Sequence, residues 1–284
     1  MSAPAGLRTG TSLPPAVQAF GQVAATFDER FGGWLSVAAQ RRAVRRQLDR
    51  AFRRGDSVLE LGGGTGIDAL YLARRGVRVL LTDGSPDMVL RAADKVRRAG
   101  LAGAVATRQL VLEELHTFVD QWTAARGPRF DGAFSNFAAL NCVADLAGVA
   151  RGLAVLLRPG APALLVVFGK WSVGEIGLHL LRGDPATACR RWARGEVPAR
   201  LAGRGFTVRY PGTPAIAAAF TPYFRLVRRR GIGIFVPPSA AEPVVSRWPG
   251  LLRLLERLDR VAAAPLALLG DHVLLEFART EVPV

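Results

Sequence analysis

The stretch Val58-Leu59-Glu60-Leu61-Gly62-Gly63-Gly64-Thr65-Gly66 (VLELGGGTG, residues 58–66) decides the fold of this chain. It predicts a short buried strand that ends in glycines and passes at once into a helix. Glycines at such a junction let the backbone turn tightly and let a ligand lie against bare main chain. The glycines alone do not identify that ligand, because residues 64–69 (GTGIDA) also fit the G-x-G-x-x-A spacing of a dinucleotide site.

Around this stretch, apolar strand-like segments alternate with helical ones. Nearly uninterrupted apolar strands between helices predict a parallel sheet covered on both faces, which is an α/β fold of three layers. Seven strands are expected at residues 57–61, 78–82, 105–109, 131–135, 163–168, 224–236 and 272–279. Helices are expected up to residue 75, at 86–98, 113–125 and 143–157, and from residue 213.

Three segments lie outside this alternation. Residues 1–55 are expected to form an N-terminal helical cap, with helices over 15–52, and residues 56–284 the sheet domain. One insertion, 171–212, follows the fifth strand and contains helices at 171–182 and 185–194 and a hairpin of strands 197–201 and 206–210. A second insertion, 237–270, follows the sixth strand and contains an amphipathic helix with the apolar stripe Leu251, Leu254, Leu255, Leu258 and Val261.

The composition excludes several classes of protein. The chain has 284 residues, half of them apolar, which is enough for a hydrophobic core and excludes a disordered chain. No uncharged apolar run reaches the ~18 residues of a membrane span, and the first residues lack the pattern of a secretory signal. The two cysteines, Cys142 and Cys189, cannot form a disulfide framework or a thiolate zinc site. A cytoplasmic location is therefore expected.

The formal net charge of +15 is unusual. A positive field of this size can attract nucleic acid, an anionic membrane surface or an acidic substrate. Lys95 and Lys170 are the two lysines, and all other basic side chains are arginines spread along the chain. This spread favours the codon usage of a GC-rich genome over a functional basic surface. Arg228–Arg230 form the one cluster that could contact an anionic or lipid-like substrate.

Two carboxylates separate the possible ligands. Glu60 lies in the strand just before the glycines, where it would repel a pyrophosphate but would suit a ligand with a positive amino group. Asp83 ends the second strand, where a carboxylate can accept hydrogen bonds from both hydroxyls of a ribose. Ser85 then caps the next helix, and Met88 can pack its apolar side chain near a purine.

Together these residues resemble the class I S-adenosylmethionine-dependent methyltransferases, which have a Rossmann-like fold. VLELGGGTG (58–66) is similar to the first motif of that family, VLLTDGSPDMV (79–89) to its acidic loop, and FDGAFSNF (130–137) to its fourth-strand motif. HVLLEFAR (272–279) resembles the final strand of the family. TFDERF (26–31) resembles the Tyr-Asp-x-x-Phe segment that covers the cofactor, with Phe27 in place of the tyrosine.

The resemblance implies S-adenosyl-L-methionine as cofactor, S-adenosyl-L-homocysteine as product, and a set of binding residues. The family places the methionine part near Glu60 and the glycine backbone, the ribose on Asp83, adenine on Met88, and the methyl group at the end of the fourth strand. The residues implied are Phe27, Glu60, Gly62, Gly63, Gly64, Asp83, Gly84, Met88, Val111, Leu112, Asn136 and Phe137. Many members hold the adenine amino group with an aspartate after the third strand. Here Val111 and Leu112 offer no such side chain, which leaves that role to backbone amides or, as a weaker alternative, to Glu113.

The acceptor is expected to be a small or lipid-like molecule. The fourth strand ends in Ser-Asn-Phe-Ala (135–138) rather than the Asn/Asp-Pro-Pro-Tyr of enzymes that methylate nucleic-acid amino groups, and no nucleic-acid-binding motif is present, so a nucleic-acid partner is not expected. No cluster has metal-ligand spacing, and no catalytic base is evident. His179, one helical turn from Glu175, is the one weak candidate.

Three other functions stay open at this point. An RNA or protein methyltransferase would use the positive charge, an NAD(P)-dependent oxidoreductase would rest on residues 64–69, and a binding module would keep the cofactor site without catalysis. The sequence does not indicate an oligomeric state.

Overall fold

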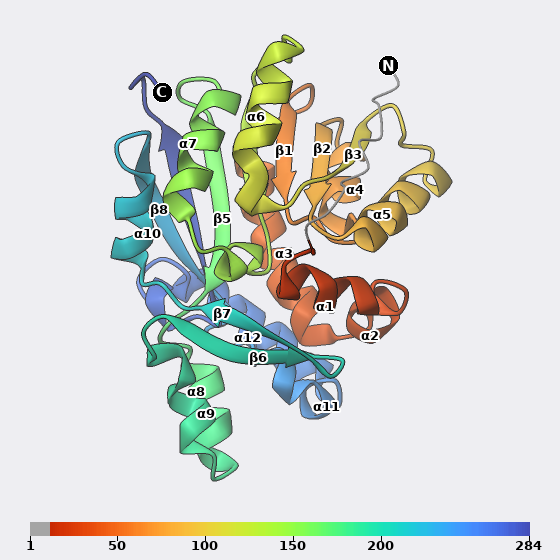
Figure 1. Cartoon of the computed structure of the whole chain (residues 1–284). Coiled ribbons are helices and arrows are strands. Elements are labelled where there is room, and N and C mark those ends of the chain that lie inside the picture. Colours follow the sequence, from red (N-terminus) through yellow and green to blue (C-terminus); the bar gives the residue numbers. More distant parts are fainter. Residues whose placement is uncertain (1–11) are drawn as a thin grey trace.

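The computed structural model describes residues 12–284 and contains one sheet of seven strands in the order β3-β2-β1-β4-β5-β9-β8 (Figure 1). β1 to β5 are mutually parallel in their pairings, whereas β9 runs antiparallel to both β5 and β8. The predicted seven-stranded, mostly parallel sheet is therefore confirmed. The strands are β1 Ser57–Leu61, β2 Arg78–Asp83, β3 Val105–Gln109, β4 Gly132–Ser135, β5 Pro162–Phe168, β8 Phe224–Ile232 and β9 His272–Arg279.

Helices cover both faces of the sheet, so the predicted three layers are present (Figure 1). α6 (Leu115–Ala124), α7 (Leu146–Leu156) and α10 (Thr213–Phe220) pack on one face. α3 (Leu35–Ala51), α4 (Ile67–Ala73) and α5 (Pro86–Arg98) pack on the other. Alternate residues of β1 explain this arrangement, since Leu59 and Leu61 join the first apolar layer and Val58 joins the second.

The remaining elements surround the carboxyl ends of the parallel strands. The N-terminal helices α1 (Pro15–Val23) and α2 (Phe27–Gly32) precede α3. A hairpin of β6 (Glu196–Leu201) and β7 (Arg204–Arg209) forms a separate two-stranded sheet. The other helices are α8 Val173–Leu181, α9 Pro185–Cys189, α11 Glu242–Val245 and α12 Pro249–Ala262, with short 3-10 turns η1 Leu112–Glu114, η2 Ala139–Cys142, η3 Arg190–Trp192, η4 Ser239–Ala241 and η5 Ala267–Leu269.

Several element boundaries differ from the sequence prediction. The helix expected at 185–194 ends at Cys189 and continues as η3, and the helix expected at 113–125 begins at Leu115 after η1. Two further differences have a clear local cause. The helical segment 15–52 is divided into three helices, because the chain turns between residues 24 and 26 and again at Gly33 and Trp34. The strand expected at 224–236 ends at Ile232, because Gly233 adopts a left-handed φ of 69° and takes the chain out of the sheet.

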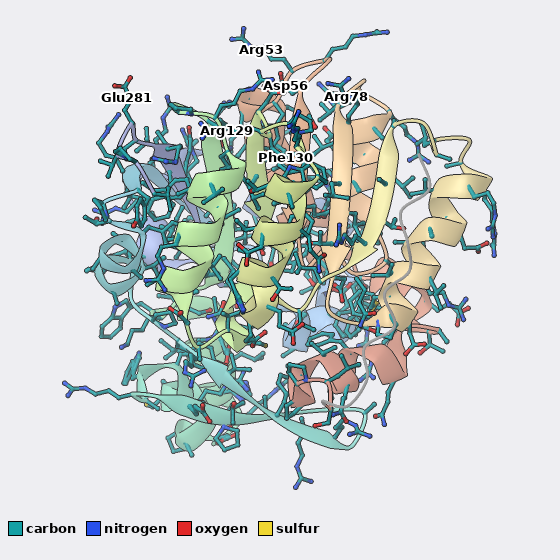
Figure 2. All side chains as sticks on the ribbon, turned by 45° about the horizontal axis from the view of Figure 1, so that its top comes forward. Arg53, Asp56, Arg78, Arg129, Phe130 and Glu281 are labelled. Atoms are coloured by element: carbon teal, nitrogen blue, oxygen red, sulfur yellow. The ribbon has the colours of Figure 1, made fainter. Side chains whose placement is uncertain are left out.

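The opposite end of the sheet, where the parallel strands begin, carries charged side chains in its loops. Arg53, Asp56, Arg78 and Arg129 lie together at this end (Figure 2). The Arg78 amide donates to the carbonyl oxygen of Asp56 at 2.8 Å, which fixes the start of β2 beside β1. The cavity described next lies at the other end of the sheet, where the parallel strands finish.

Candidate active site

A cavity of about 510 Å³ lies at the carboxyl ends of the parallel strands. Its walls include residues that follow β1, β2, β3 and β4 directly, and Phe168 at the end of β5. The cap contributes Phe27, and the hairpin contributes Phe206. Ligands of α/β sheets bind at this edge of the fold, and the volume lies within the range of about 300–1,000 Å³ that small-molecule sites occupy.

The glycine loop after β1 presents bare backbone to the cavity. Gly62 and Gly64 have left-handed φ values of 66° and 54°. A Cβ on Gly62 would lie 2.4 Å from the Cβ of Ala139, whereas a Cβ on Gly64 would meet nothing within 4 Å. Gly62 therefore lacks a side chain because of packing, and Gly64 leaves free space on the cavity side of the loop.

Glu60 is a buried carboxyl beneath this loop. Its Oε2 has no hydrogen-bond partner among the described residues, although the side chain lines the cavity. Burial raises the pKa of Glu60 well above its ordinary value, and the nearby carboxylates of Asp68 and Asp83 add to that shift. An unpartnered buried oxygen at a cavity wall is a group that needs a ligand to satisfy it.

Asp83 closes the second strand with a fixed carboxylate. Its Oδ2 accepts a hydrogen bond from the Gly64 amide at 2.8 Å, and its Oδ1 accepts one from the Ser85 amide at 2.9 Å. The Ser85 hydroxyl accepts from the Met88 amide at 3.2 Å and caps α5, as the sequence predicted. Burial raises the pKa of Asp83, while the two amide donors oppose that shift. The carboxylate is thus oriented by the same loop that shapes the cavity.

The end of β4 carries a polar network that the sequence did not reveal. The Asn136 Nδ2 donates to Asp68 Oδ2 at 2.7 Å, and the Arg45 Nε donates to Asp68 Oδ1 at 2.8 Å. The next two residues, Phe137 and Ala138, have left-handed φ values of 50° and 65°. Such strained backbone in residues other than glycine concentrates at functional sites. Asp68 lies in the first turn of α4, two residues after the glycine motif, but nothing in its spacing marked it as a partner of Asn136.

The cap is attached to the glycine loop by polar contacts. Thr65 Oγ1 donates to Asp28 Oδ1 at 2.7 Å, and Asp28 also pairs with Lys95 of α5. Phe27 stands at the start of α2, where its ring packs against that of Phe31 with 4.8 Å between centroids. Helix α2 is therefore held over one end of the cavity.

The other end of the cavity contains a buried charge cluster. Arg191 is buried between Glu175 and Asp271, and its distance to the Asp271 carboxylate is 2.7 Å. These carboxylates raise the pKa of Arg191 against the opposing effect of burial. Glu175 is thus paired with Arg190 and Arg191, and His179 instead lies 3.7 Å from Asp184.

His272 is a cavity-lining group that the sequence analysis did not mark as a site residue. It begins β9 beside the end of β5, and its ring stacks on that of Phe168 with 5.0 Å between centroids. Its Nδ1 has no hydrogen-bond partner among the described residues. Burial lowers the pKa of His272 from its ordinary value, against the opposing effect of the neighbouring Asp271 carboxylate. Its place opposite Phe168 depends on an antiparallel pairing that no local pattern encodes.

The structure brings together nearly all of the expected cofactor residues. Phe27, Glu60, Gly62, Gly63, Gly64, Asp83, Gly84, Met88, Leu112, Asn136 and Phe137 all line the cavity, and so does His179. Val111 is buried and does not line it. Its Cγ2 lies 3.7 Å from the position that a Cβ on Gly84 would take, so Val111 packs against the turn at Gly84.

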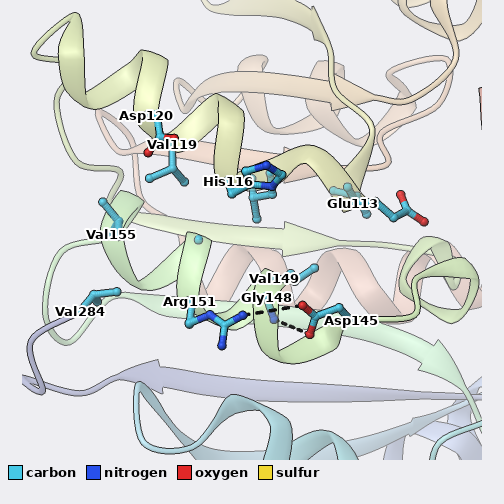
Figure 3. Close-up of a pocket in the computed structure, with 13 residues that line it drawn as sticks. Glu113, His116, Val119, Asp120, Asp145, Gly148, Val149, Arg151, Val155 and Val284 are labelled. Carbon is cyan, nitrogen blue, oxygen red and sulfur yellow. Dashed lines mark hydrogen bonds and ion pairs between the residues drawn. The ribbon is translucent and has the colours of Figure 1, made fainter. Parts of the chain in front are cut away.

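A second, smaller hollow of about 260 Å³ lies between α6 and α7 (Figure 3). Asp145 caps α7 there by accepting from the Gly148 amide at 2.7 Å and pairs with Arg151 at 3.7 Å. Of the expected cofactor residues, only Leu112 reaches this hollow. Within residues 12–284, no group of three His, Cys, Asp or Glu side chains could hold a metal ion, and no helix is long and apolar enough to cross a membrane.

Comparison with known proteins agrees with the geometry. A family model described as a methyltransferase domain matches residues 37–210. The ubiquinone/menaquinone biosynthesis C-methyltransferase UbiE of Methylococcus capsulatus is 37% identical over 103 residues, which cover 33% of this chain and 42% of that protein. The chain thus matches less than half the length of this relative.

Solved structures share the fold. The CcbJ methyltransferase from Streptomyces caelestis is 15% identical, with 92% of this chain and 98% of that chain covered and a TM-score of 0.59. The DhpI–SAH complex is 17% identical, with 96% and 100% covered and a TM-score of 0.55. With the family model covering more than half of its length, the chain belongs to the methyltransferase-domain family, which confirms the predicted resemblance to the class I S-adenosylmethionine-dependent methyltransferases.

Proposed function

We propose that this enzyme transfers the methyl group of S-adenosyl-L-methionine to a small-molecule or lipid-like acceptor. The observation that carries the proposal is a single cavity that joins the carboxylates and bare glycine loop at one end to aromatic side chains at the other. When bound, the cofactor supplies an electrophilic methyl group on a sulfonium. Alignment of donor and acceptor within one cavity can then contribute much of the rate, about 7–11 kcal/mol.

The residues at the cofactor end fit this ligand. Glu60 would receive the amino group of the methionine part, which would satisfy its unpartnered Oε2. The open side of Gly64 would lie against the same part of the ligand. Asp83 would accept hydrogen bonds from the ribose hydroxyls, because two amides already orient its carboxylate and the side chain lines the cavity. S-adenosyl-L-homocysteine, the product, would keep all these contacts.

The remaining predicted residues complete the site. Met88 would lie against adenine, whose amino group would be held by backbone at Val111 and Leu112. Asn136 and Phe137, at the strained end of β4, would face the methyl group. Phe27 would cover the cofactor from α2, without the hydrogen bond that a tyrosine could give.

Residues of the cap and of the first insertion line the acceptor end of the cavity. The rings of Phe20 in α1 and Phe206 in β7 pack at 5.9 Å between centroids, and Arg204 donates to the Gln18 side chain at 2.5 Å. Phe168 and Tyr210 form part of the wall. A covered cavity with aromatic walls suits a small apolar acceptor better than a base or side chain of a macromolecule. We assign the cap, residues 1–55, and the insertions 171–212 and 237–270 to the selection of that acceptor.

An acidic acceptor must lose a proton when it is methylated. His272 is better placed than His179 to accept it, since His272 stacks on Phe168 at the end of β5 and meets Phe137, after β4, edge-on. Burial lowers the pKa of His272, which favours the uncharged imidazole that can accept a proton.

The alternatives fit the site less well. A nicotinamide dinucleotide would place its pyrophosphate over the glycine loop, directly above the buried Glu60 carboxyl. An RNA or protein acceptor would have to pass beneath the cap that Asp28 holds to Thr65.

The proposal is tested by transfer of a radioactive methyl group from S-adenosyl-L-methionine to heat-treated cell fractions. Label is expected in the small-molecule or lipid fraction, and Asp83→Ala should remove it, whereas Asp87→Ala, which changes an exposed carboxylate of the same turn, should not. Calorimetry with S-adenosyl-L-homocysteine should show the same difference. Label in RNA or protein would overturn the proposed acceptor class.

A further inference from the structure

Helix α12 exposes four of the five residues of the predicted apolar stripe, whereas Leu255 is half-buried and packs inward. Leu254 is 51% exposed, Leu258 44% and Val261 80%, and Trp248 just before the helix is 64% exposed. In most globular proteins such a stripe faces the core. Leu251 extends this surface by one turn. We call Trp248, Leu251, Leu254, Leu258 and Val261 the α12 stripe.

The orientation of α12 is fixed by polar contacts on its inner side. Asp259 is buried, and its carboxylate accepts from the amides of Ile234 and Phe235, at 3.3 and 2.6 Å. Glu256 accepts from the Arg42 guanidinium of α3, at 2.5 Å.

Leu252 is buried with Ala39 and Val236, and Leu255 packs against the same cluster, so the inner side of the helix is apolar as well as acidic. Leu251, Leu254 and Leu258 face outward, and rotating them into the protein would break the contacts of the inner side.

The same surface carries unneutralised positive charge. Four arginines on or next to α12 are exposed and make no ion pair with any residue in 12–284: Arg247, Arg253, Arg257 and Arg260. The one acidic side chain of the helix besides Asp259 is Glu256, and it is paired with Arg42. An apolar stripe with a tryptophan at its end and arginines along its side is typical of helices that lie in the interface of a bilayer.

We propose that α12 docks this methyltransferase flat on a membrane surface containing anionic lipids. The leucines would enter the boundary between headgroups and acyl chains, and the arginines would contact lipid phosphates. A second copy of the chain fits this surface less well, because its arginines would meet the same arginines. A nucleic acid would leave the leucines in water. The inference concerns the outside of the protein and does not depend on the identity of the acceptor.

The position of α12 connects this surface to the cavity. Pro238, Ser239 and Ala240 line the cavity, and the chain runs from them through α11 directly into α12. Figure 1 places α11 and α12 beneath the sheet, at the same end of the molecule as the β6–β7 hairpin. Docking through α12 would therefore bring the cavity close to the lipid surface.

Vesicle flotation with the full chain tests the proposal. Binding is expected to vesicles of equimolar phosphatidylcholine and phosphatidylglycerol and not to vesicles of phosphatidylcholine alone. Leu254→Gln/Leu258→Gln should weaken binding at least about tenfold. Each of Arg253→Gln, Arg257→Gln and Arg260→Gln should weaken it roughly fivefold at low salt. All these side chains are exposed, so the melting temperatures should stay close to that of the wild type.

Matched changes on α5 serve as controls. Leu90 is an isolated exposed leucine on another arginine-rich helix, and Leu90→Gln should leave vesicle binding unchanged. Arg91→Gln, which changes an exposed arginine of α5 that makes no ion pair within residues 12–284, should likewise have little effect. Absence of binding to the anionic vesicles would overturn the proposal. So would equal losses in the α5 and α12 variants, or a dimer of the wild type that Leu254→Gln/Leu258→Gln converts to a monomer.

Discussion

The buried Glu60 carboxyl should make both folding and ligand binding depend on pH. Burial and the carboxylates of Asp68 and Asp83 raise the pKa of Glu60 above its ordinary value of 4.5. At pH values between 4.5 and the raised pKa, the folded protein holds a proton on Glu60 that the unfolded chain has released. The free energy of unfolding therefore falls as pH rises through this window. Glu60→Gln cannot ionise. The variant should therefore unfold at a higher temperature than the wild type at neutral pH, and the difference should shrink as pH falls towards 4.5.

Ligand binding should have the opposite dependence. The ammonium of S-adenosyl-L-homocysteine would favour the ionised form of Glu60, so the wild type should release up to one proton on binding. Its affinity should then rise with pH over the same window, by at most about tenfold per pH unit. Glu60→Gln loses an interaction with a charged group, worth about 1.5–3 kcal/mol, or roughly 10- to 150-fold in Kd at the alkaline end. At the acidic end the two proteins should bind with similar affinity.

Calorimetry can measure both effects. Titration of S-adenosyl-L-homocysteine in two buffers with different heats of ionisation gives the number of protons released, which should be near one for the wild type and near zero for Glu60→Gln. Asp87→Asn, which changes an exposed carboxylate near the cavity, is the control and should behave as the wild type. The reasoning is refuted if the wild type and Glu60→Gln show the same affinity and the same proton release across the window.

Two further changes probe the backbone and the charge cluster. Gly64→Ala should cost only about 1–2 kcal/mol in stability, because the new Cβ meets nothing within 4 Å. The same Cβ should nevertheless block the binding of S-adenosyl-L-homocysteine. Gly62→Ala should destabilise the protein more, since its Cβ would lie 2.4 Å from that of Ala139. Urea unfolding and calorimetry separate the two. Arg191→Met should lower the free energy of unfolding by about 3–5 kcal/mol, because it removes the buried guanidinium between two buried carboxylates and leaves Asp271 without its arginine partner. Arg190→Met should cost about 1 kcal/mol or less, because Arg190 is partly exposed and Glu175 keeps Arg191. Equal losses in urea unfolding would contradict this account of the cluster.

The sequence was most informative where chemistry and chain position coincide. Gly64 and Asp83 are 19 residues apart, yet both follow strands of one parallel sheet, so their approach could be predicted from the motif and the fold alone. The Ser85 cap was predictable for the same reason, since the interaction is local. Predictions of this kind depend on the backbone and need no knowledge of side-chain packing.

Contacts between distant segments could not be predicted in this way. Asp68 meets Asn136 only because β1 and β4 are neighbours in the sheet, and Arg45 reaches Asp68 from a helix that precedes both. His272 is 104 residues from Phe168 along the chain and beside it in the antiparallel pairing of β5 with β9. Their roles depend on strand order, which periodicity does not encode.

The α12 stripe shows a different limit. Its period predicts a helix correctly, but period alone does not say which way the apolar face points. Contacts on the inner side decide this. Asp259 binds backbone amides after β8, Glu256 pairs with Arg42, and Leu252 joins a buried apolar cluster. Asp259, which sequence reasoning assigns to the polar face, is therefore buried together with Leu252 and Ala262.

This orientation also changes the interpretation of the net charge. The number of arginines cannot distinguish codon usage from function, but their surroundings can. Near the cofactor end, Arg45 is paired with Asp68, so its charge serves to hold a carboxylate in place. Beside α12, the exposed arginines lack acidic partners among the described residues and stand next to exposed leucines. Codon usage places arginines without regard to such neighbours. If vesicle binding is lost with changes on α12 and kept with the same changes on α5, position rather than total charge explains the basic surface.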